Sequence, residues 1–245
     1  MRPSNRQEKN VPGKIVEDLS AGVTGTAERV LIGLNWTIVV GPMGLGFAHT
    51  SARGTSGCNG LPMPGSYTGK KLLELSHLTV STNVFEQAIG FAAINAHHNR
   101  FDLEGNDKNG LDLIEDHGER TVVIGQFPGL SHRMPNAAVI ERDPRPGCYP
   151  ESAAADLLPN ATNVLITASS LTNGSLANLL ALATNAYVVL VGPSAPLSPI
   201  LFHHGIDAIS GFIARDCDML MRTVMEGGAV RAMKPHGRFL TLERQ

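Results

Sequence analysis

The sequence predicts an α/β protein in two parts, an α+β domain over residues 1–110 and a Rossmann-like α/β domain over residues 111–245. Two β-prone runs precede helices in the first part, whereas strands and helices alternate in the second. Aromatic residues make up 5% of the chain and glycine occurs 26 times. This composition favours a core of small aliphatic side chains with several tight turns.

The first part is expected to begin with a hairpin, because residues 36–41 and 44–50 are two β-prone runs joined by a short turn. A short helix is predicted around residues 70–77. A longer helix is predicted from an Asn83 cap to about His98. Apolar residues cover much of its circumference, so we expect this helix to be central.

A polar stretch over residues 99–120, with one helical segment at 111–116, predicts a linker between the two parts. Beyond it, five short apolar runs predict strands covered on both faces, at residues 121–124, 137–141, 163–167, 186–191 and 208–213. Amphipathic segments predict helices at residues 176–183, at 199–204 before Gly205, and between Asp216 and Gly227. The alternation predicts a doubly wound, mostly parallel, three-layer sheet that binds ligands at one edge.

Charge and composition exclude several partners. The formal net charge is −2, with 20 basic and 22 acidic side chains, so we expect no nucleic acid and no membrane surface as partners. Residues 1–10 are polar and no apolar run reaches about 18 residues, which predicts a soluble, cytoplasmic protein. Cys58, Cys148 and Cys217 are far apart, so we expect reduced thiols. Homo-oligomerisation stays open.

Candidate ligand-binding loops follow the predicted strands. The segment from Gly125 through Phe127 and Pro128 lies where dinucleotide-binding folds place a glycine loop, but Pro128 lacks a backbone N–H and the spacing is not GxGxxG. A packing turn is the alternative, with Phe127 available to cover a ligand. Glu141 ends the next strand, where a carboxylate can bind a ribose; a solvated carboxylate explains it equally well.

Two more loops are rich in polar or rigid residues. The loop after residue 166 carries five hydroxyl or amide side chains, those of Thr167, Ser169, Ser170, Thr172 and Asn173. Helix capping explains Thr172 and Asn173, but it needs fewer groups than these. The next loop holds its backbone rigid and contains Gly192, Pro193, Ser194 and Pro196. We expect both loops to bind a ligand.

The histidines form no local metal motif. The sequence lacks CxxC, HxH and HxxxH, and the neighbours His97-His98 and His203-His204 would point about 100° apart on a helix. A histidine in the last helical turn also interacts well with exposed carbonyls. Asn95 is a sharper signal, because a carboxamide on an apolar helix face needs a backbone partner or a ligand at the domain junction. We favour the second alternative, a ligand at the domain junction.

Four motifs carry a family resemblance: Ala88-Ile89-Gly90 to Ala93-Ile94-Asn95-Ala96; Gly125-Gln126-Phe127-Pro128; Leu190-Val191-Gly192-Pro193 to Pro196-Leu197; and Leu201-Phe202 to His204-Gly205 with Ser210-Gly211 and Asp216. Together they resemble a family of uncharacterised prokaryotic proteins named for heavy-metal chelation, and the match spans most of the chain. The resemblance implies an enolase N-terminal-like domain, a Rossmann-like domain and a shared cleft. It favours His204 among the histidines.

The leading hypothesis is a protein that binds a small molecule or a metal complex in this interdomain cleft, with a role in metal homeostasis or cofactor handling. A divalent or heavy-metal ion would lie between Asn95, Glu141, His204 and the loops of Thr167 and Ser194. The alternative is an enzyme with a nucleotide or adenosyl cofactor and with His204 or Glu141 as general base. A third hypothesis is a module that contacts a protein partner.

Overall fold

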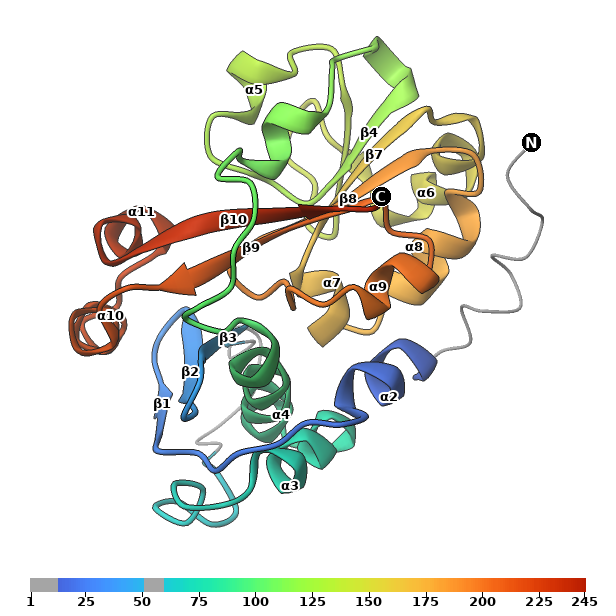
Figure 1. Cartoon of the computed structure of the whole chain (residues 1–245). Coiled ribbons are helices and arrows are strands. Elements are labelled where there is room, and N and C mark those ends of the chain that lie inside the picture. Colours follow the sequence, from blue (N-terminus) through green and yellow to red (C-terminus); the bar gives the residue numbers. More distant parts are fainter. Residues whose placement is uncertain (1–12, 51–59) are drawn as a thin grey trace.

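The structure, a computed structural model, describes residues 13–50 and 60–245 (Figure 1). Its N-terminal part contains an antiparallel sheet in the order β1-β2-β3 and is built from α2 (Lys14–Ser20), β1 (Arg29–Ile32), β2 (Trp36–Val40), β3 (Leu45–His49), α3 (Leu72–Ser76), η1 (His77–Val80) and α4 (Val84–His98). The predicted hairpin and both predicted helices are confirmed. Helix α2 and strand β1 were not predicted; β1 is half-buried at every residue and therefore lacks an alternating pattern.

Helix α4 is the centre of the N-terminal part. Its predicted cap is confirmed, since the Asn83 side chain accepts hydrogen bonds from the backbone N–H groups of Phe85 and Glu86. Every residue from Ala88 to Ala96 is buried, as the apolar circumference predicts. Strand β3 approaches α4 closely at Gly46, where an added Cβ would lie 2.0 Å from the Ala92 carbonyl oxygen.

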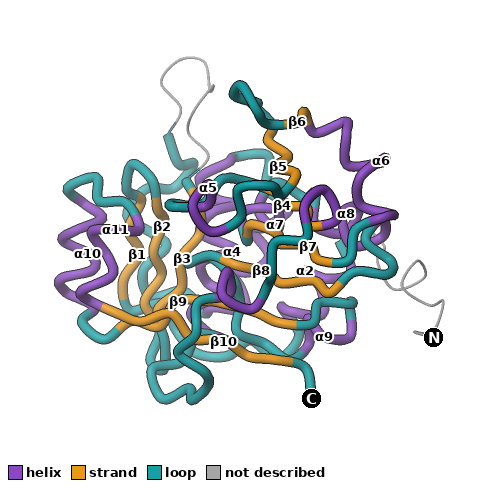
Figure 2. The backbone as a smooth tube through the Cα atoms, turned by 90° about the horizontal axis from the view of Figure 1, so that it is seen from above, coloured by secondary structure: helices purple, strands orange, loops and turns teal. Residues whose placement is uncertain are grey.

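The C-terminal part contains a larger sheet of β4 (Thr121–Ile124), β5 (Ala138–Glu141), β6 (Tyr149–Pro150), β7 (Asn163–Thr167), β8 (Tyr187–Val191), β9 (Ala208–Ala214) and β10 (Gly237–Glu243). The order is β10-β9-β8-β7-β4-β5-β6 (Figure 2). Only β10 runs antiparallel to its neighbour. The five predicted strands are confirmed. The two edge strands were not predicted, because β6 spans two residues and β10 is mostly half-buried.

The sheet is the middle of three layers, as predicted. One face packs against η2 (Gly110–Leu113) and α5 (Leu130–Arg133); the other packs against α6 (Ala154–Leu157), α7 (Ser169–Thr172), α8 (Leu176–Leu182) and α9 (Ile200–His203). Alternate residues divide between the faces: Val164 and Ile166 join the core of α6 to α9, and Leu165 joins that of α5. Alternation of side chains along each strand therefore produces both cores.

The remaining helices lie at the ends of the strands. They are η3 (Gly118–Arg120), η4 (Glu151–Ala153), η5 (Leu158–Asn160), α10 (Cys217–Met225), α11 (Val230–Met233) and η6 (Lys234–His236). Asp216 caps α10 through a hydrogen bond from Met219 N, and Gly227 follows its end with φ +83°, as predicted. The prediction of a helix over residues 111–116 is wrong beyond Leu113, where η2 ends, because the backbone at Ile114 is extended and its side chain is buried.

The predicted linker is packed against the sheet rather than free. Asn106 and Thr241 exchange backbone hydrogen bonds of 3.1 and 2.7 Å, so the segment covers the outer edge of β10. A domain boundary at residue 110 stays a prediction. Within the described residues, no helix is long and apolar enough to cross a bilayer. Cys148 and Cys217 are free, whereas Cys58 and residues 1–10 lie outside the described ranges.

The β2–β3 hairpin is buried on both faces and so joins the two parts. Val39 and Ala48 belong to the core that contains α4. Ile38 and Phe47 belong to a second core shared with β9, α10 and α11. In this core the Phe47 and Phe212 rings meet edge to face, with 5.7 Å between their centroids. The two parts therefore share hydrophobic cores.

Two buried amides, Asn95 on α4 and Asn99 at its C-cap, connect the parts further. The Asn95 side chain donates to the carbonyl oxygens of Phe47 (2.6 Å) and Ser194 (2.9 Å). The Asn99 oxygen accepts from the Leu197 N–H at 2.8 Å. Asn95 therefore lies where the two parts meet, and its amide donates to backbone carbonyls of both, the alternative that the sequence left open; a ligand contact by Asn95 stays a prediction.

We expect Asn99→Ala to lower the free energy of unfolding by about 2 kcal/mol, because it leaves buried backbone groups of Ala195 and Leu197 without partners. Urea unfolding would measure the change. Asn185→Ala, at an exposed turn, is the control and should change stability by less than about 0.5 kcal/mol. Equal stability of Asn99→Ala and the parent would contradict the role of this amide.

We expect Gly46→Ala to lower the free energy of unfolding by about 3 kcal/mol or more, because the new methyl group would overlap the α4 backbone, which cannot move without disturbing the core. Thermal unfolding followed by circular dichroism measures the loss. Gly60→Ala is the matched control, since an added Cβ there meets no atom within 4 Å. A melting temperature unchanged by Gly46→Ala would show that the two elements do not pack this closely.

Candidate functional site

The strand order creates a switch point between β4 and β7, where the following segments leave toward opposite faces of the sheet. Gly125 lies at this point with φ +96°, and its N–H donates to the Ile140 carbonyl at 2.9 Å. A Cβ at Gly125 would lie 2.8 Å from the methyl carbon of Thr167. The turn after β4 therefore touches the last residue of β7, and only glycine fits both the turn and the contact.

A cleft of about 410 Å³ lies at this edge, within the size range of small-molecule sites. Its lining includes eight of the residues predicted from the sequence: Gly125, Glu141, Thr167, Ser169, Asn173, Gly192, Pro193 and Ser194. Trp36 and His49, which are paired across the β2–β3 hairpin, also line it. The cleft therefore takes its walls from both parts of the chain.

Six other predicted residues do not line the cleft: Asn95, Phe127, Pro128, Thr172, Pro196 and His204. Phe127 packs against the core on the α5 side of the sheet, which agrees with a packing turn. Pro196 is buried, and Thr172 lines a separate, wider groove of about 1010 Å³ between α2, η1, α4 and α7. Asn95 supports the cleft indirectly by holding the Ser194 backbone.

His204 lies in the contact between α9 and α2. Its Nε2 donates to the Asp18 carboxylate at 2.9 Å, and Asp18 also pairs with Lys14 at 2.9 Å. Its Nδ1 is buried without a partner among the described residues. The other histidine pair serves packing: Nε2 of His98 donates to the Leu19 carbonyl at 2.8 Å, and burial lowers the pKa of His97 and His98.

The part of the chain that the structure describes holds no cluster of three or more His, Cys, Asp or Glu side chains suited to a metal ion. The cleft offers mainly oxygen atoms. The hydroxyls of Thr167 and Ser169 lie 3.1 Å apart, and the side chain of Asn173 accepts hydrogen bonds from the backbone and hydroxyl of Ser175. Asn173 thus caps the turn before α8 while lining the cleft.

Two buried polar atoms of cleft residues lack hydrogen-bond partners within the described ranges. They are Nε1 of Trp36, a side chain only 9% exposed, and Oγ of Ser170, which is fully buried. Buried polar groups are almost always paired, so these two atoms are exceptions, and both lie beneath the surface of the cleft rather than on it. Sequence reasoning included Ser170 in a polar loop but gave no signal for Trp36, which reads as an ordinary strand residue.

Charged groups gather at one end of the lining. Glu141 and Arg142 follow β5, and Glu151 begins η4. Arg142 Nε lies 3.7 Å from the Glu151 carboxylate, in an exposed pair worth about 0–1 kcal/mol. Arg142 and Asn173 also line the wider groove, so the two hollows are neighbours. Sequence reasoning found Glu141 but not the roles of Arg142 and Glu151.

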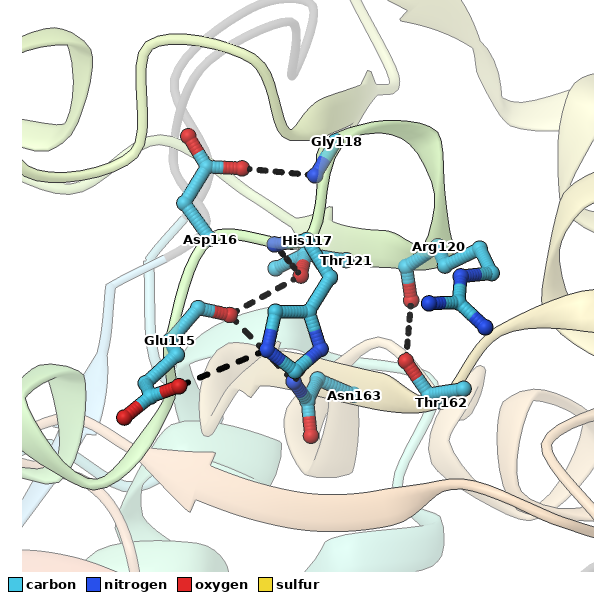
Figure 3. Close-up of polar contacts among 8 residues, drawn as sticks. All are labelled: Glu115, Asp116, His117, Gly118, Arg120, Thr121, Thr162 and Asn163. Atoms are coloured by element: carbon cyan, nitrogen blue, oxygen red, sulfur yellow. Dashed lines mark hydrogen bonds and ion pairs between the residues drawn. The ribbon is translucent and has the colours of Figure 1, made fainter.

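Local hydrogen bonds join the amino ends of the two central strands, at the end of the sheet opposite the cleft (Figure 3). Thr121, at the start of β4, accepts from His117 N at 2.9 Å and donates to the Glu115 carbonyl at 3.1 Å. Asn163, at the start of β7, donates to the same carbonyl at 3.2 Å. The starts of the two central strands are therefore tied to each other, and the cleft lies at their carboxyl ends.

Two family models match the chain, and both are described as "Putative heavy-metal chelation". One covers residues 16–98 and the other, DUF364, covers residues 109–243. No curated protein matches the chain significantly. The expected resemblance is therefore confirmed, and its two parts follow the two parts of the fold.

Solved structures agree with the fold over nearly the whole chain. A DUF364 protein of unknown function from Desulfitobacterium hafniense DCB-2 is 27% identical, with a TM-score of 0.84 over 95% of this chain and 99% of that one. A second, from Pyrococcus horikoshii, is 22% identical, with a TM-score of 0.75 over 97% and 100% of the two chains; it supports the fold alone.

The alternative of a nucleotide- or adenosyl-binding enzyme finds no support. The Gly125 turn leads into α5, which spans only four residues, whereas a dinucleotide site places the phosphates at the start of a longer helix. Pro128 removes one N–H from the turn, and the matching families carry no nucleotide-binding description.

We expect Asp18→Asn to destabilise the protein at neutral pH and to do so less as the pH falls below about 4. The Lys14 hydrogen bond, and then that of His204, lowers the pKa of the Asp18 carboxyl in the folded state. A lowered folded pKa gives stability that is present above the unfolded pKa and lost as pH falls through the folded one. Urea unfolding at pH 3 and pH 6 measures it.

Glu17→Gln is the control for this comparison, because Glu17 also pairs with Lys14 on α2 but does not contact His204. It should change stability less than Asp18→Asn at pH 6. A difference between parent and Asp18→Asn that stays constant from pH 6 to pH 3 would show that the carboxylate does not hold α2 in place.

Proposed function

We propose that this chain, which belongs to the heavy-metal chelation family, binds a small molecule or a metal complex in the cleft at the carboxyl ends of β4, β5, β7 and β8. The cleft lies where ligands bind in doubly wound sheets, outside the switch point of the strand order. Its rigid walls, with proline and glycine turns on one side and a buried hairpin on the other, suit a preformed binding site.

The position and the composition of the cleft are the observation that carries this proposal. Side chains from both parts of the chain line one hollow outside the switch point, among them Trp36, Glu141 and Ser194. A hollow of this size at the strand ends, lined by several polar groups, is where α/β proteins commonly bind small molecules.

The donor set favours a complexed metal over a bare ion. The carboxylates and hydroxyls of the lining are hard oxygen ligands, whereas heavy metals prefer sulfur and nitrogen. The described residues also lack a three-ligand cluster. A metal already held by an organic chelator needs only hydrogen bonds to the chelator and one or two oxygen contacts, which this cleft offers.

We expect calorimetry on metal-free protein to show that zinc complexes of histidine and citrate bind with higher affinity than zinc ions alone. Glu141→Gln should weaken binding of the preferred complex about tenfold, the effect of losing one contact to a charged group. Glu115→Gln is the matched control, since Glu115 is an exposed carboxylate at the opposite edge of the same sheet (Figure 3). It should leave binding unchanged.

Two outcomes would contradict the proposal. Either no complex binds more tightly than about millimolar, or both glutamate variants weaken binding equally, which would place the ligand outside the cleft. Native mass spectrometry of freshly purified protein gives an independent check, because a copurified small molecule should be lost from Glu141→Gln and kept by Glu115→Gln.

A further inference from the structure

The wider groove between α2, η1, α4 and α7 adjoins the cleft and differs from it in chemistry. Its volume is about 1010 Å³. Phe91 and Leu171 lie deep in its lining, with 7% and 6% of their surface exposed, whereas Leu73 and Val80 are 42% and 86% exposed. Large apolar side chains gathered at one open place commonly mark a binding surface. The groove therefore offers apolar contact that a ligand can reach.

The polar side chains of the groove place few demands on a ligand. The Ser76 hydroxyl donates to the Leu73 carbonyl at 2.8 Å, and the Thr79 hydroxyl donates to the Ser76 carbonyl at 2.9 Å. The Gln87 amide donates to the Ser81 carbonyl at 2.7 Å. Because these donors already bond to backbone, the part of a ligand that lies here gains mainly by burying apolar surface.

Helix α7 separates the groove from the cleft (Figure 1). Ser169 lines the cleft, and Leu171, two residues later, lines the groove. Side chains two residues apart on a helix point about 200° apart, so this four-residue helix presents a hydroxyl on one side and an apolar side chain on the other. The two hollows thus lie on opposite sides of one short element.

The hollows meet where α7 ends. Asn173, which follows the helix, and Arg142 line both hollows, and both side chains are exposed. Gly174 lines the groove with φ +76°, and an added Cβ there would meet no atom of the described residues within 4 Å. The ridge at Asn173 is therefore a surface turn over which one molecule can pass.

From this arrangement we infer that the ligand of the cleft has two parts. A polar head lies in the cleft beside Glu141, and an uncharged apolar arm crosses the end of α7 at Asn173 and lies in the groove. The inference rests on the proposed function and adds the class of ligand, an organic chelator or its metal complex with an apolar arm. The arm is uncharged because Glu17 and Arg142 of the groove already pair with Lys14 and Glu151.

Two zinc complexes test the arm, with calorimetry on metal-free protein as the measurement. Zinc–Nα-methylhistidine and zinc–Nα-octylhistidine share a head and differ only in the length of the alkyl arm. Each fully buried methylene tightens binding about fourfold, so the octyl complex should bind at least about 30-fold more tightly even when only part of the arm is buried. Glu141→Gln should weaken both complexes about tenfold, because the head is the same.

Variants of the groove locate the arm. Val80→Asp puts a carboxylate at a side chain that is 86% exposed, and it should lower the affinity ratio of the octyl to the methyl complex about tenfold. Leu73→Asp repeats the test from α3. Leu34→Asp is the matched control, since Leu34 is 73% exposed and is not among the residues that line either hollow; it should keep the ratio. Circular dichroism checks that all three fold.

The outcomes separate the inference from the proposed function. Equal affinity of the two complexes, or a ratio that Val80→Asp and Leu73→Asp leave unchanged, would overturn the arm while leaving a ligand site in the cleft. Octyl binding that ignores Glu141→Gln would show that the groove binds apolar chains by itself, and would also overturn it. A dimer in sedimentation that Val80→Asp dissociates would assign the groove to a second copy instead. Failure of both complexes and of zinc–citrate to bind would overturn the proposed function as well.

Discussion

The two-sided burial of the β2–β3 hairpin is the constraint on which the rest of this structure depends. One face packs against α4, where Gly46 allows backbone contact, and the other packs against Phe212 and α10. A strand pair buried in this way cannot be displaced from either part without opening a core. The N-terminal part is therefore fixed against the carboxyl edge of the larger sheet.

This constraint explains how the cleft acquires a wall that the Rossmann-like sheet alone would lack. Strand-end loops commonly form ligand sites by themselves, but here the hairpin adds Trp36 and His49 to the lining. Asn95 reinforces the arrangement, because it holds one carbonyl of the hairpin and one of the Ser194 loop. The packing between the two parts and the proposed site thus meet at α4, whose family motif contains this asparagine.

Much of the fold was predictable, because buried parallel strands and capped helices leave strong local patterns. Edge strands such as β1 and β10 leave weak ones, since half-buried residues do not alternate clearly. In the site, Gly125, Glu141 and Ser194 follow from strand-end position alone. Trp36 could not be found, because its partners depend on tertiary contacts. His204 was favoured by a motif, yet it contacts α2 outside the cleft.

The shared cores also determine how a ligand can be received. Proteins that close around a ligand by hinge motion need an interface with few contacts between their moving parts. Here the two walls are joined by continuous packing and by buried amides, so the fold itself sets the width of the cleft. For the proposed ligand site, selectivity then comes from fit and hydrogen bonding, and the molecule should keep the same overall dimensions whether empty or filled.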